Sequence, residues 1–429
     1  MAEERPLRVA VLGRSVYALH GVGGLERHLY DLVRYHLDAG WRVTLVTRTP
    51  SAPLGVDPDR WQLVAGHPEF SACFVPYRTF PLAGRRGTTI IDRSTAYPVF
   101  GRRAGIVAAQ LVARDEVDVV YGVGASAWGY AAARARGARA PLVLNPQGLE
   151  EFGGADGRYG GQRLKGLGYA PLQAVVRRTA RASDAVIATD EAILPAVLRH
   201  LPVAADVVRV IPNGLDVQDL HRLVDPAAGR AMRERAAIGD DTVLLVSVGR
   251  IEANKGFADL AAALAAMPGD IAWRWVLVGD GPARPALERS LHESGLASRV
   301  LITGRVDDRT LHAWYDAADL FVHPTRYEGS SLVTLEAMLH RLPVLATRAG
   351  GLPDKVAPGA TGWLAEPGSP EALARTLADA LVAQDRWAAY GEAGRRLLEE
   401  RFDWRVIQRR FGELYRELIA RDAGSRRGA

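Results

Sequence analysis

Short apolar runs alternate with helix-like patterns along the first half of the chain. Residues 7–13 form an apolar run that ends in glycine, which is typical of a buried parallel strand. Residues 25–38 carry apolar positions at helical spacing, and Gly40 ends this helix before a strand at 41–47. Further strands are expected at 117–121, 142–145 and 185–188. This alternation predicts a parallel sheet with helices on both faces.

A second series of the same kind begins near residue 241. The predicted strands are 242–249, 273–278, 299–302, 320–322 and 344–346, and the predicted helices are 257–266, 283–294, 308–317 and 331–341. Two successive doubly wound α/β units therefore fit the 429 residues better than one large sheet. We expect one domain at 1–212 and a second at 213–401, with the crossover near 207–216. Residues 53–95 show no clear spacing of apolar positions that would assign them to strands or helices.

The last part of the chain is expected to be helical, at about 371–399 and 402–420. The second of these helices carries an apolar stripe that must pack on another element. We expect residues 402–429 to return to the first domain through this stripe, which consists of Phe402, Trp404, Ile407, Phe411, Leu414, Tyr415 and Leu418.

Composition favours an intracellular enzyme. One cysteine, Cys73, cannot form an internal disulfide, no apolar run reaches the length of a membrane span, and the start lacks the order of a signal peptide. The formal charge is +5, with an excess of basic residues in the first 190. That excess suits an anionic membrane or a phosphate-bearing substrate, although scattered solvated charge explains it equally well.

Two glutamates stand around a predicted strand-to-helix turn. Glu328 follows the strand at 320–325, at the carboxyl end where doubly wound sheets bind ligands. The next residues, Ser330, Ser331 and Leu332, begin a helix whose free N–H groups favour phosphate. Glu336 lies farther into that helix and is expected to reach a second part of the same ligand. The alternative is a capped helix with two solvated glutamates.

The segment after the first strand of the second domain is basic. Gly249 ends the strand, and Arg250 and Lys255 flank the turn before the next helix. An arginine fork and a lysine charge at one crevice suit a diphosphate. Lys255 is one of only three lysines, with Lys165 and Lys355, which favours a functional role over that of a surface loop.

Gly23 and Gly24 lie between the first strand and its helix, where backbone N–H groups can approach a phosphate without interference from Cβ. A plain tight turn explains them equally well. The dinucleotide fingerprint G-x-G-x-x-G is missing at the required spacing, which counts against an NAD enzyme.

As an ordered set, these segments resemble family 4 of the retaining glycosyltransferases, whose GT-B fold has two facing Rossmann-like domains. The similarity runs from residue 7 to about 365, and Phe402-Asp-Trp404 is similar to the closing helix of the family. The matching segments are Gly23-Gly-Leu-Glu26, Val210 to Asp216, Gly249-Arg250, Lys255-Gly256, Val278 to Pro282, Asp319 to Pro324, Glu328 to Met338 and Gly350-Gly351.

The resemblance implies roles for individual residues. Arg250 and Lys255 would bind the donor diphosphate and stabilise the leaving nucleoside diphosphate, and Glu328 would hold hydroxyls of the donor sugar; these three are the catalytic candidates. The other residues implied in donor binding are Gly23, Gly24, Gln147, Asn213, Gly249, Ser330, Ser331, Leu332 and Glu336, the last at the ribose. The family usually needs no metal, so no cofactor is expected. Attack on the face that the leaving group departs from, with a phosphate oxygen taking the acceptor proton, is likewise implied by the resemblance.

One position departs from the family pattern. Many members have a histidine after the strand that corresponds to 142–145, and this chain has Gln147 there. Glutamine forms hydrogen bonds but does not titrate, so a proton-handling role at this position is in doubt. His20 is the alternative, with a loop histidine equally plausible, and His323 and His340 are interpreted as packing or surface residues.

The acceptor is not specified by the sequence, and a saccharide, a lipid-linked or a small-molecule hydroxyl all fit. Residues 163–181 combine basic and apolar positions, which gives the hypothesis of a peripheral contact with the inner face of a membrane; an ordinary surface helix is the alternative. Nucleic acid is not expected as a partner because the basic residues lack regular aromatic neighbours. The competing functions are a non-catalytic nucleotide-sugar-binding protein and a sugar-nucleotide epimerase on the same fold.

Overall fold

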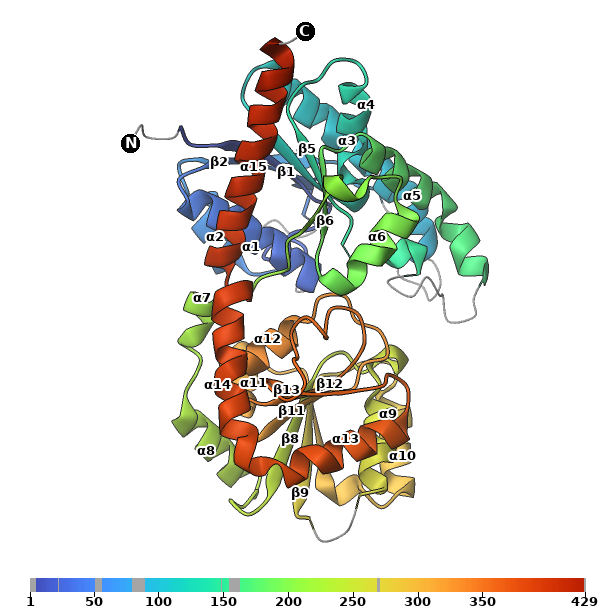
Figure 1. Cartoon of the computed structure of the whole chain (residues 1–429), viewed down its shortest axis with the longest axis vertical. Coiled ribbons are helices and arrows are strands. Elements are labelled where there is room, and N and C mark those ends of the chain that lie inside the picture. Colours follow the sequence, from blue (N-terminus) through green and yellow to red (C-terminus); the bar gives the residue numbers. More distant parts are fainter. Residues whose placement is uncertain are drawn as a thin grey trace. The chain divides into compact units, whose positions relative to one another are not determined.

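The structure is a computed structural model that describes residues 5–21, 23–50, 56–78, 89–147, 149–153, 163–267 and 271–427; within these ranges the side chains at 89, 150, 163–165 and 425–427 are not described. The chain divides into two compact units (Figure 1). Unit 1 consists of Met1–Asn213 and Trp404–Ala429, and unit 2 of Gly214–Asp403.

Unit 1 contains a parallel sheet in the order β3-β2-β1-β4-β5-β6-β7. Its strands are β1 (Arg8–Leu12), β2 (Arg42–Arg48), β3 (Phe70–Val75), β4 (Val119–Val123), β5 (Leu142–Asn145), β6 (Ala185–Ala188) and β7 (Val208–Val210). Its helices are α1 (Gly24–Asp38), α2 (Pro58–Ala65), α3 (Thr89–Ala113), α4 (Trp128–Arg134), α5 (Arg163–Arg181), α6 (Leu194–His200) and α15 (Trp404–Arg427).

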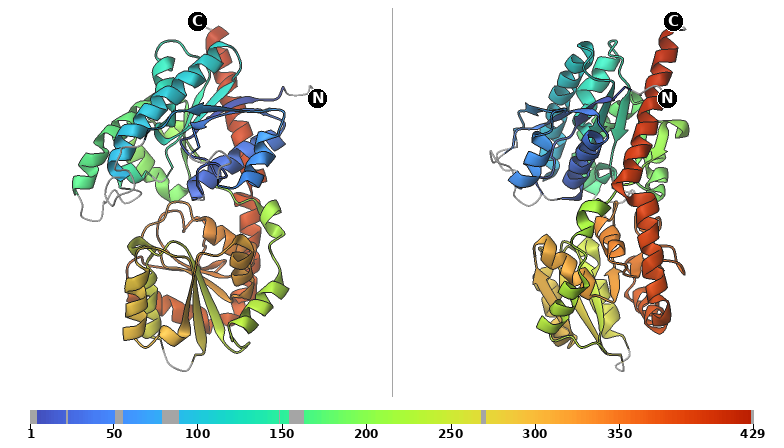
Figure 2. Two further views of the ribbon diagram at one scale, coloured as in Figure 1. Left: turned by 180° about the vertical axis from the view of Figure 1, so that it is seen from behind. Right: turned by 90° about the vertical axis from the view of Figure 1, so that its left-hand side faces the viewer.

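Successive side chains of each strand in unit 1 point to opposite faces of the sheet. In β1, Val9 and Val11 pack in the hydrophobic cluster that includes α1 and α15, whereas Ala10 and Leu12 pack in the cluster that includes α3, α4 and α5. Both sets are buried, which explains why the run is continuously apolar. Helices consequently cover both faces of the sheet (Figure 2).

The last helix, α15, belongs to unit 1, as its apolar stripe predicts. Trp404, Ile407 and Phe411 are fully buried in the same cluster as α1. Phe402 differs from the rest of the stripe because it is buried in the core of unit 2. The return of the chain to unit 1 therefore begins at Trp404.

Unit 2 contains a second parallel sheet in the order β10-β9-β8-β11-β12-β13. Its strands are β8 (Val243–Val248), β9 (Trp273–Val278), β10 (Val300–Gly304), β11 (Leu320–His323), β12 (Val344–Thr347) and β13 (Gly362–Ala365). Its helices are α7 (Val217–His221), α8 (Pro226–Arg235), α9 (Phe257–Ala265), α10 (Arg284–Glu293), α11 (Asp308–Ala317), α12 (Leu332–Leu339), α13 (Pro370–Val382) and α14 (Trp387–Leu397).

The predicted fold class of two doubly wound units is confirmed, with differences in detail. Strands β3, β7 and β13 were not predicted. β3 is an edge strand that is only partly buried, so it shows no continuous apolar run. The single helix expected at 371–399 is two helices, α13 and α14, with a turn at Ala383–Arg386.

Candidate functional site

Glu328 is the centre of a charged network at the carboxyl end of β11 in unit 2. Its Oε2 accepts a hydrogen bond from Lys255 Nζ at 2.8 Å and lies 2.8 Å from His323 Nε2. The three side chains come from the turn before α9, from the last residue of β11 and from the loop before α12. The structure thus brings the predicted residues Lys255 and Glu328 into direct contact.

Two glycines with positive φ allow the loops of this network to approach one another. A Cβ atom at Gly256 (φ 69°) would lie 1.9 Å from the carbonyl oxygen of Pro324, just after β11. A Cβ atom at Gly350 (φ 51°) would lie 1.8 Å from the carbonyl oxygen of Glu328. Side chains at either position would therefore push Lys255 or Glu328 out of place.

The network keeps Glu328 ionised. Burial acts to raise its pKa, but the hydrogen bond and charge of His323 and the ammonium group of Lys255 outweigh burial and lower the pKa to about 2. Since an ionised carboxylate only accepts hydrogen bonds, His323 Nε2 carries the hydrogen in this contact. At neutral pH, Glu328 can therefore accept hydrogen bonds from ligand hydroxyls but cannot donate a proton.

The helix after Glu328 has a side-chain cap, as in the alternative interpretation of this turn. Ser331 is the N-cap of α12, and its Oγ accepts a hydrogen bond from the backbone N–H of Thr334 at 3.3 Å; Leu332 is the first residue of the helix. Ser330 Oγ lies 3.3 Å from Nζ of Lys355, which is completely buried. Both serines therefore already take part in the structure of the loop.

Glu336 lies in the middle of α12 and is partly buried. Its Oε2 accepts a hydrogen bond of 3.0 Å from the hydroxyl group of Tyr315. Burial, and then the negative charge of Glu336, raise the pKa of that hydroxyl. Glu336 is therefore held by a neutral donor, whereas Glu328 is held by a lysine and a histidine.

Gly249 and Arg250 follow β8 on the same edge of the sheet. Gly249 has a φ of 154°. The side chain of Arg250 is 64% exposed, and its Nε forms an ion pair of 2.9 Å with Glu252. Ion pairs this exposed contribute about 0–1 kcal/mol, so Arg250 can exchange Glu252 for an anionic ligand at little cost.

Gln147 follows β5 in unit 1, with a left-handed backbone (φ 58°). Its N–H donates to Asn145 Oδ1 at 2.9 Å, and Asn145 Nδ2 donates to Tyr121 at 2.7 Å. The hydroxyl group of Tyr121 also contacts His28 Nε2 at 3.0 Å. The backbone of Gln147 is thus held by a buried chain, while its Nε2 is buried without a hydrogen-bond partner among the described residues.

The other residues predicted in unit 1 have simple structural settings. Gly23 is the N-cap of α1 and Gly24 is its first residue, at the carboxyl end of β1. Asn213 is buried at the end of the first segment of unit 1. His20 Nε2 donates to the carbonyl oxygen of Arg48 at 2.8 Å, so this histidine ties the loop after β1 to the end of β2.

The sequence interpretation missed the roles of His323 and Lys355. His323 was grouped with packing or surface residues, yet it contacts Glu328; its position as the last residue of a strand, five before a candidate glutamate, was the available signal. Lys355 was noted only as a rare lysine. His340, in contrast, packs away from Glu328 in a buried chain with Asp316 and His312, at 2.7 Å from each.

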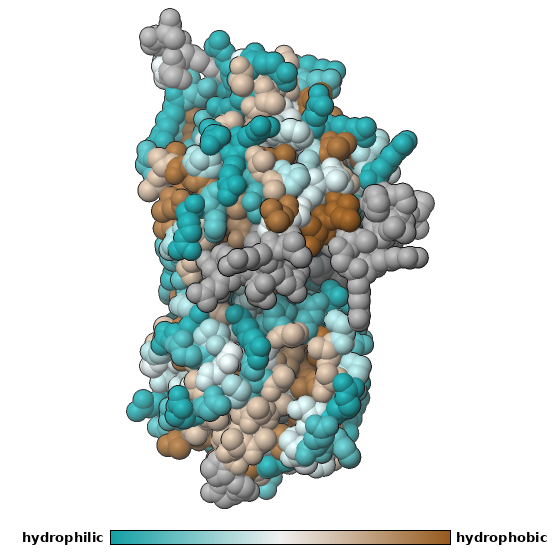
Figure 3. Space-filling view, turned by 90° about the vertical axis from the view of Figure 1, so that its right-hand side faces the viewer, coloured by the Kyte–Doolittle hydropathy of each residue, from teal (hydrophilic) through white to brown (hydrophobic). Residues whose placement is uncertain are grey.

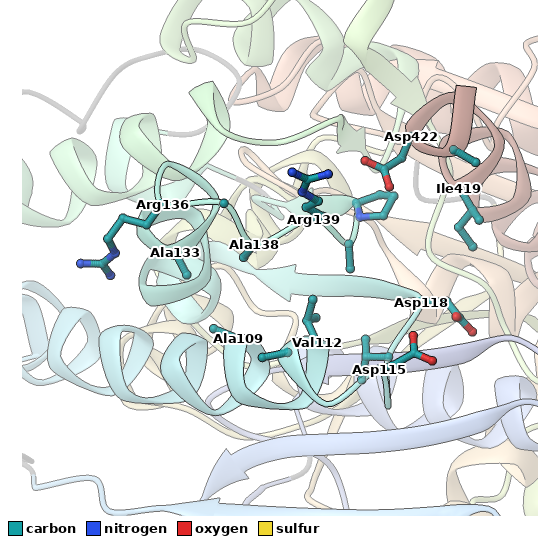
Figure 4. A pocket seen from close by; sticks show the side chains of 16 residues that line it. Ala109, Val112, Asp115, Asp118, Ala133, Arg136, Ala138, Arg139, Ile419 and Asp422 are labelled. Carbon is teal, nitrogen blue, oxygen red and sulfur yellow. The ribbon is translucent and has the colours of Figure 1, made fainter. Parts of the chain in front are cut away.

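A cavity of about 590 Å³ in unit 1 lies away from these residues (Figure 4). It is lined where β4 and β5 begin, by residues that include Asp118 and Pro141, and by Asp422 of α15. Ligands of doubly wound sheets bind at the carboxyl ends of the strands, so this cavity is not the candidate site. A smaller cavity at the carboxyl ends contains Arg14, Tyr97 and Gln147.

The described residues contain neither a metal-binding cluster nor a membrane-spanning helix. No three His, Cys, Asp or Glu side chains of that part of the chain are grouped so as to hold a metal ion. None of the helices within the described ranges is long and apolar enough to cross a membrane.

Two family models match the chain in succession. Residues 22–219 match the model for Glycosyltransferase Family 4, and residues 242–382 match that for Glycosyl transferases group 1. The alpha-maltose-1-phosphate synthase of Mycolicibacterium smegmatis is 32% identical over 268 residues, which cover 59% of this chain and 68% of that protein. The D-inositol 3-phosphate glycosyltransferase of Xylanimonas cellulosilytica is 34% identical over 229 residues, which cover 52% and 54%. The chain thus spans about half the length of several curated relatives that it matches.

Solved structures with similar folds extend over nearly the whole chain. The sucrose-phosphate synthase of Thermosynechococcus elongatus has a TM-score of 0.72 at 24% identity, with 97% of this chain and 100% of that chain covered. The Anabaena HepE protein in complex with UDP has a TM-score of 0.71 at 22% identity, with 96% and 100% covered. At these identities the likeness concerns the fold.

Proposed function

Because the chain belongs to glycosyltransferase family 4, we propose that it transfers a sugar from a nucleotide-sugar donor to an acceptor hydroxyl, with retention of the anomeric configuration. The observation that carries this proposal is the network of Lys255, Glu328 and His323 at the carboxyl end of β11. We assign the donor to unit 2, where this network lies, and the acceptor to unit 1.

In this proposal the cationic side chains bind the donor diphosphate. The ammonium group of Lys255 has three hydrogens, and the bond to Glu328 uses only one of them. Arg250 is exposed and adds a planar fork of donors after release from Glu252. Together with the N–H groups at the start of α12, these cations would stabilise the charge that develops on the leaving nucleoside diphosphate.

Glu328 would orient the donor sugar. The bonds to Lys255 and His323 lie on Oε2 of its carboxylate, and its low pKa holds it ionised at neutral pH. Charge-assisted hydrogen bonds to two sugar hydroxyls would fix the anomeric carbon relative to the leaving group. Glu336 would contact the ribose, and a phosphate oxygen of the donor would take the acceptor proton.

A panel of UDP-, GDP-, ADP- and dTDP-sugars tests the proposal, with the released nucleoside diphosphate measured with and without candidate acceptors. We expect one donor to be hydrolysed slowly without acceptor and faster with one, and NMR of the product to show the same anomeric configuration as the donor. Binding of a donor without any release of diphosphate would favour a sensor. Conversion of the sugar without its transfer would favour an epimerase.

We separately propose that α5 contacts a membrane surface through its exposed side chains. Tyr169, Leu172 and Val176 are buried in the core of unit 1, and Arg177 Nε donates to the carbonyl oxygen of His200 at 3.0 Å. These positions match the alternative of a surface helix. Leu167, however, is 71% exposed, and Figure 3 shows apolar surface on unit 1.

The remaining exposed cations of α5 allow a direct test. Arg178 and Arg181 are exposed near the end of the helix. If α5 contacts a membrane, replacing both with Gln should weaken sedimentation with anionic vesicles, and replacing Leu167 with Ser should weaken it further. Unchanged sedimentation in both variants would exclude this contact.

A further inference from the structure

Two arginines lie over one tyrosine ring at the carboxyl edge of the unit 1 sheet. Arg14 follows β1, and Arg48 is the last residue of β2. Their guanidinium carbons lie 5.8 Å and 5.7 Å from the centroid of the Tyr77 ring, and Arg14 also lies 5.1 Å from that of Tyr97. Two like charges are therefore held close together on an aromatic support.

The nearby carboxylate of Asp92 compensates only part of this charge. One of its oxygens, Oδ2, accepts a hydrogen bond from Tyr77 at 2.8 Å and lies 3.9 Å from Arg14. The Nε of Arg48 is buried and has no hydrogen-bond partner among the described residues. A buried donor without a partner destabilises the folded protein, and an acceptor atom of a ligand would remove that cost.

The positive charges of the two arginines also lower the pKa values of basic groups around them. Burial, and then the charge of Arg14, lower the pKa of Arg48, whereas Glu26 and Asp92 oppose this shift with smaller effects. Burial, and then the charges of Arg48 and Arg14, lower the pKa of His20 to about 4 against two backbone hydrogen bonds. The region is thus electropositive at neutral pH and contains a neutral histidine.

Arg14 also lines the smaller cavity of unit 1, whose volume of about 50 Å³ admits one or two hydroxyl groups rather than a whole sugar ring. Ser15, Arg93, Gln147 and Glu151 line the same cavity. Nε2 of Gln147 is a second buried donor without a partner among the described residues. An anionic group at the arginines would thus belong to a molecule whose hydroxyls reach Gln147.

We propose that unit 1 binds an acceptor that carries a phosphomonoester, with the phosphate held by Arg14 and Arg48 and a hydroxyl group of the sugar or polyol part in the small cavity beside Gln147. This inference rests on the proposed function, because it names the chemical class of the acceptor. A phosphate dianion matches two guanidinium forks in charge and in hydrogen-bond geometry, which a neutral hydroxyl does not.

Equilibrium binding to the full chain, without any donor, tests this site apart from turnover. Isothermal titration calorimetry would compare glucose 6-phosphate and inositol 1-phosphate with glucose and inositol. We expect only the phosphorylated compounds to bind, with inorganic phosphate as a weaker competitor. Arg14→Gln and Arg48→Gln should each weaken binding at least tenfold, and Arg48→Lys should weaken it less than Arg48→Gln.

Arg102→Gln is the matched control, since it removes the same charge from an exposed position on α3. It should leave the dissociation constant within twofold of the wild type, and circular dichroism would verify that all variants fold. The site would be wrong if Arg14→Gln and Arg48→Gln bound the phosphorylated compounds as tightly as the wild type, or if glucose bound equally well.

A second arm distinguishes a free sugar phosphate from a lipid headgroup. Sedimentation with phosphatidylcholine vesicles that contain phosphatidic acid should depend on Arg14 and Arg48 only if the phosphate belongs to a lipid. The experiments also distinguish failure of the proposed transferase activity from failure of the proposed phosphate site. Arginine-dependent phosphate binding without release of nucleoside diphosphate would contradict only the enzyme. Release of nucleoside diphosphate with no such binding would contradict only this site.

Discussion

The carboxyl edges of the two sheets have the same topology but opposite electrostatic character. In unit 2 the carboxylate of Glu328 is surrounded by Lys255 and His323, so its charge is compensated before any ligand arrives. In unit 1 Arg48 and Gln147 keep buried donors without partners among the described residues. The charge at the first edge is thus paired in advance, although His323 Nδ1 there also lacks a hydrogen-bond partner among the described residues, whereas at the second edge the unpartnered groups are donors.

This difference indicates how each edge would respond to mutation. Removing one member of a compensated network leaves the others buried without a partner, which is costly. Removing a donor that has no partner costs the folded protein little and affects only ligand binding. Variants of unit 2 should therefore lose activity and stability together, whereas variants of the donors in unit 1 should lose binding alone.

The largest expected effect is that of Glu328→Gln on sugar transfer. The amide keeps the shape of the side chain but loses the charge that holds the sugar hydroxyls. Two charge-assisted hydrogen bonds of about 1.5–3 kcal/mol each imply a fall in kcat/KM of roughly 10²–10⁴. Steady-state kinetics would measure it, with Glu293→Gln at an exposed position of α10 as the matched control. Wild-type turnover in Glu328→Gln would contradict the site.

The second prediction concerns stability against pH. The folded-state pKa of Glu328 is about 2, below the 4.5 of a free glutamate, so the network stabilises the fold fully above pH 4.5 and loses this contribution as the pH falls toward 2. A shift of this size corresponds to roughly 3 kcal/mol. Urea unfolding should show that the stability difference between wild type and Glu328→Gln shrinks over this range. If the stability difference between the two proteins did not change with pH, the neighbours of Glu328 would not lower its pKa.

The third prediction tests the buried chain behind Gln147. Tyr121→Phe removes the hydroxyl group that Asn145 and His28 contact, and we expect a loss of about 1–3 kcal/mol in the free energy of unfolding. Denaturant titration would measure this loss. Tyr415→Phe provides a comparison in the same hydrophobic cluster, because the Tyr415 hydroxyl makes a longer contact of 3.4 Å with His36 Nε2. An equal, small effect of both changes would show that the chain does not hold the end of β5.

The smallest expected effect is that of replacing Gln147. Histidine adopts left-handed backbone conformations more readily than most residues, so Gln147→His should fold normally. We expect kcat to change less than about tenfold, because the new imidazole retains one hydrogen-bond donor. A pH–rate profile that gains an inflection near the pKa of histidine would show that the new side chain takes part in the reaction. An unchanged profile would assign residue 147 to hydrogen bonding alone.

The parts of the fold that the sequence predicted are those whose strands are buried on both faces. β1, β4 and β8 read as continuous apolar runs because helices cover them on both sides. β3 and β13 lie at the edges of their sheets with mixed burial patterns, so neither produced a clear signal. The division of the final segment at Trp404 depends on which core each aromatic residue joins, and spacing alone does not specify this.

The sequence predicted those site residues whose neighbours along the chain already indicate their role. Glu328 and Lys255 were found because each follows a strand end beside glycine. The partnership of His323 with Glu328 depends on a loop that turns back on the end of β11, and Lys355 meets Ser330 across 25 residues. The arginine pair of unit 1 comes from two different strands, and Tyr77 and Asp92 join them only through tertiary folding.

The place where the chain leaves unit 2 has a consequence for how the molecule can be divided. The N–H of Leu215 donates to the carbonyl oxygen of Phe402 at 2.7 Å, so the first and last residues of unit 2 are neighbours. Unit 2 is therefore an insertion whose two ends meet, and it is suited to excision as a fragment or to circular permutation. A protein cut after Asn213, in contrast, would lack Trp404, Ile407 and Phe411 and would expose the face of unit 1 that α15 covers. We therefore expect removal of unit 2 as one segment to disturb the core of unit 1 less than removal of α15.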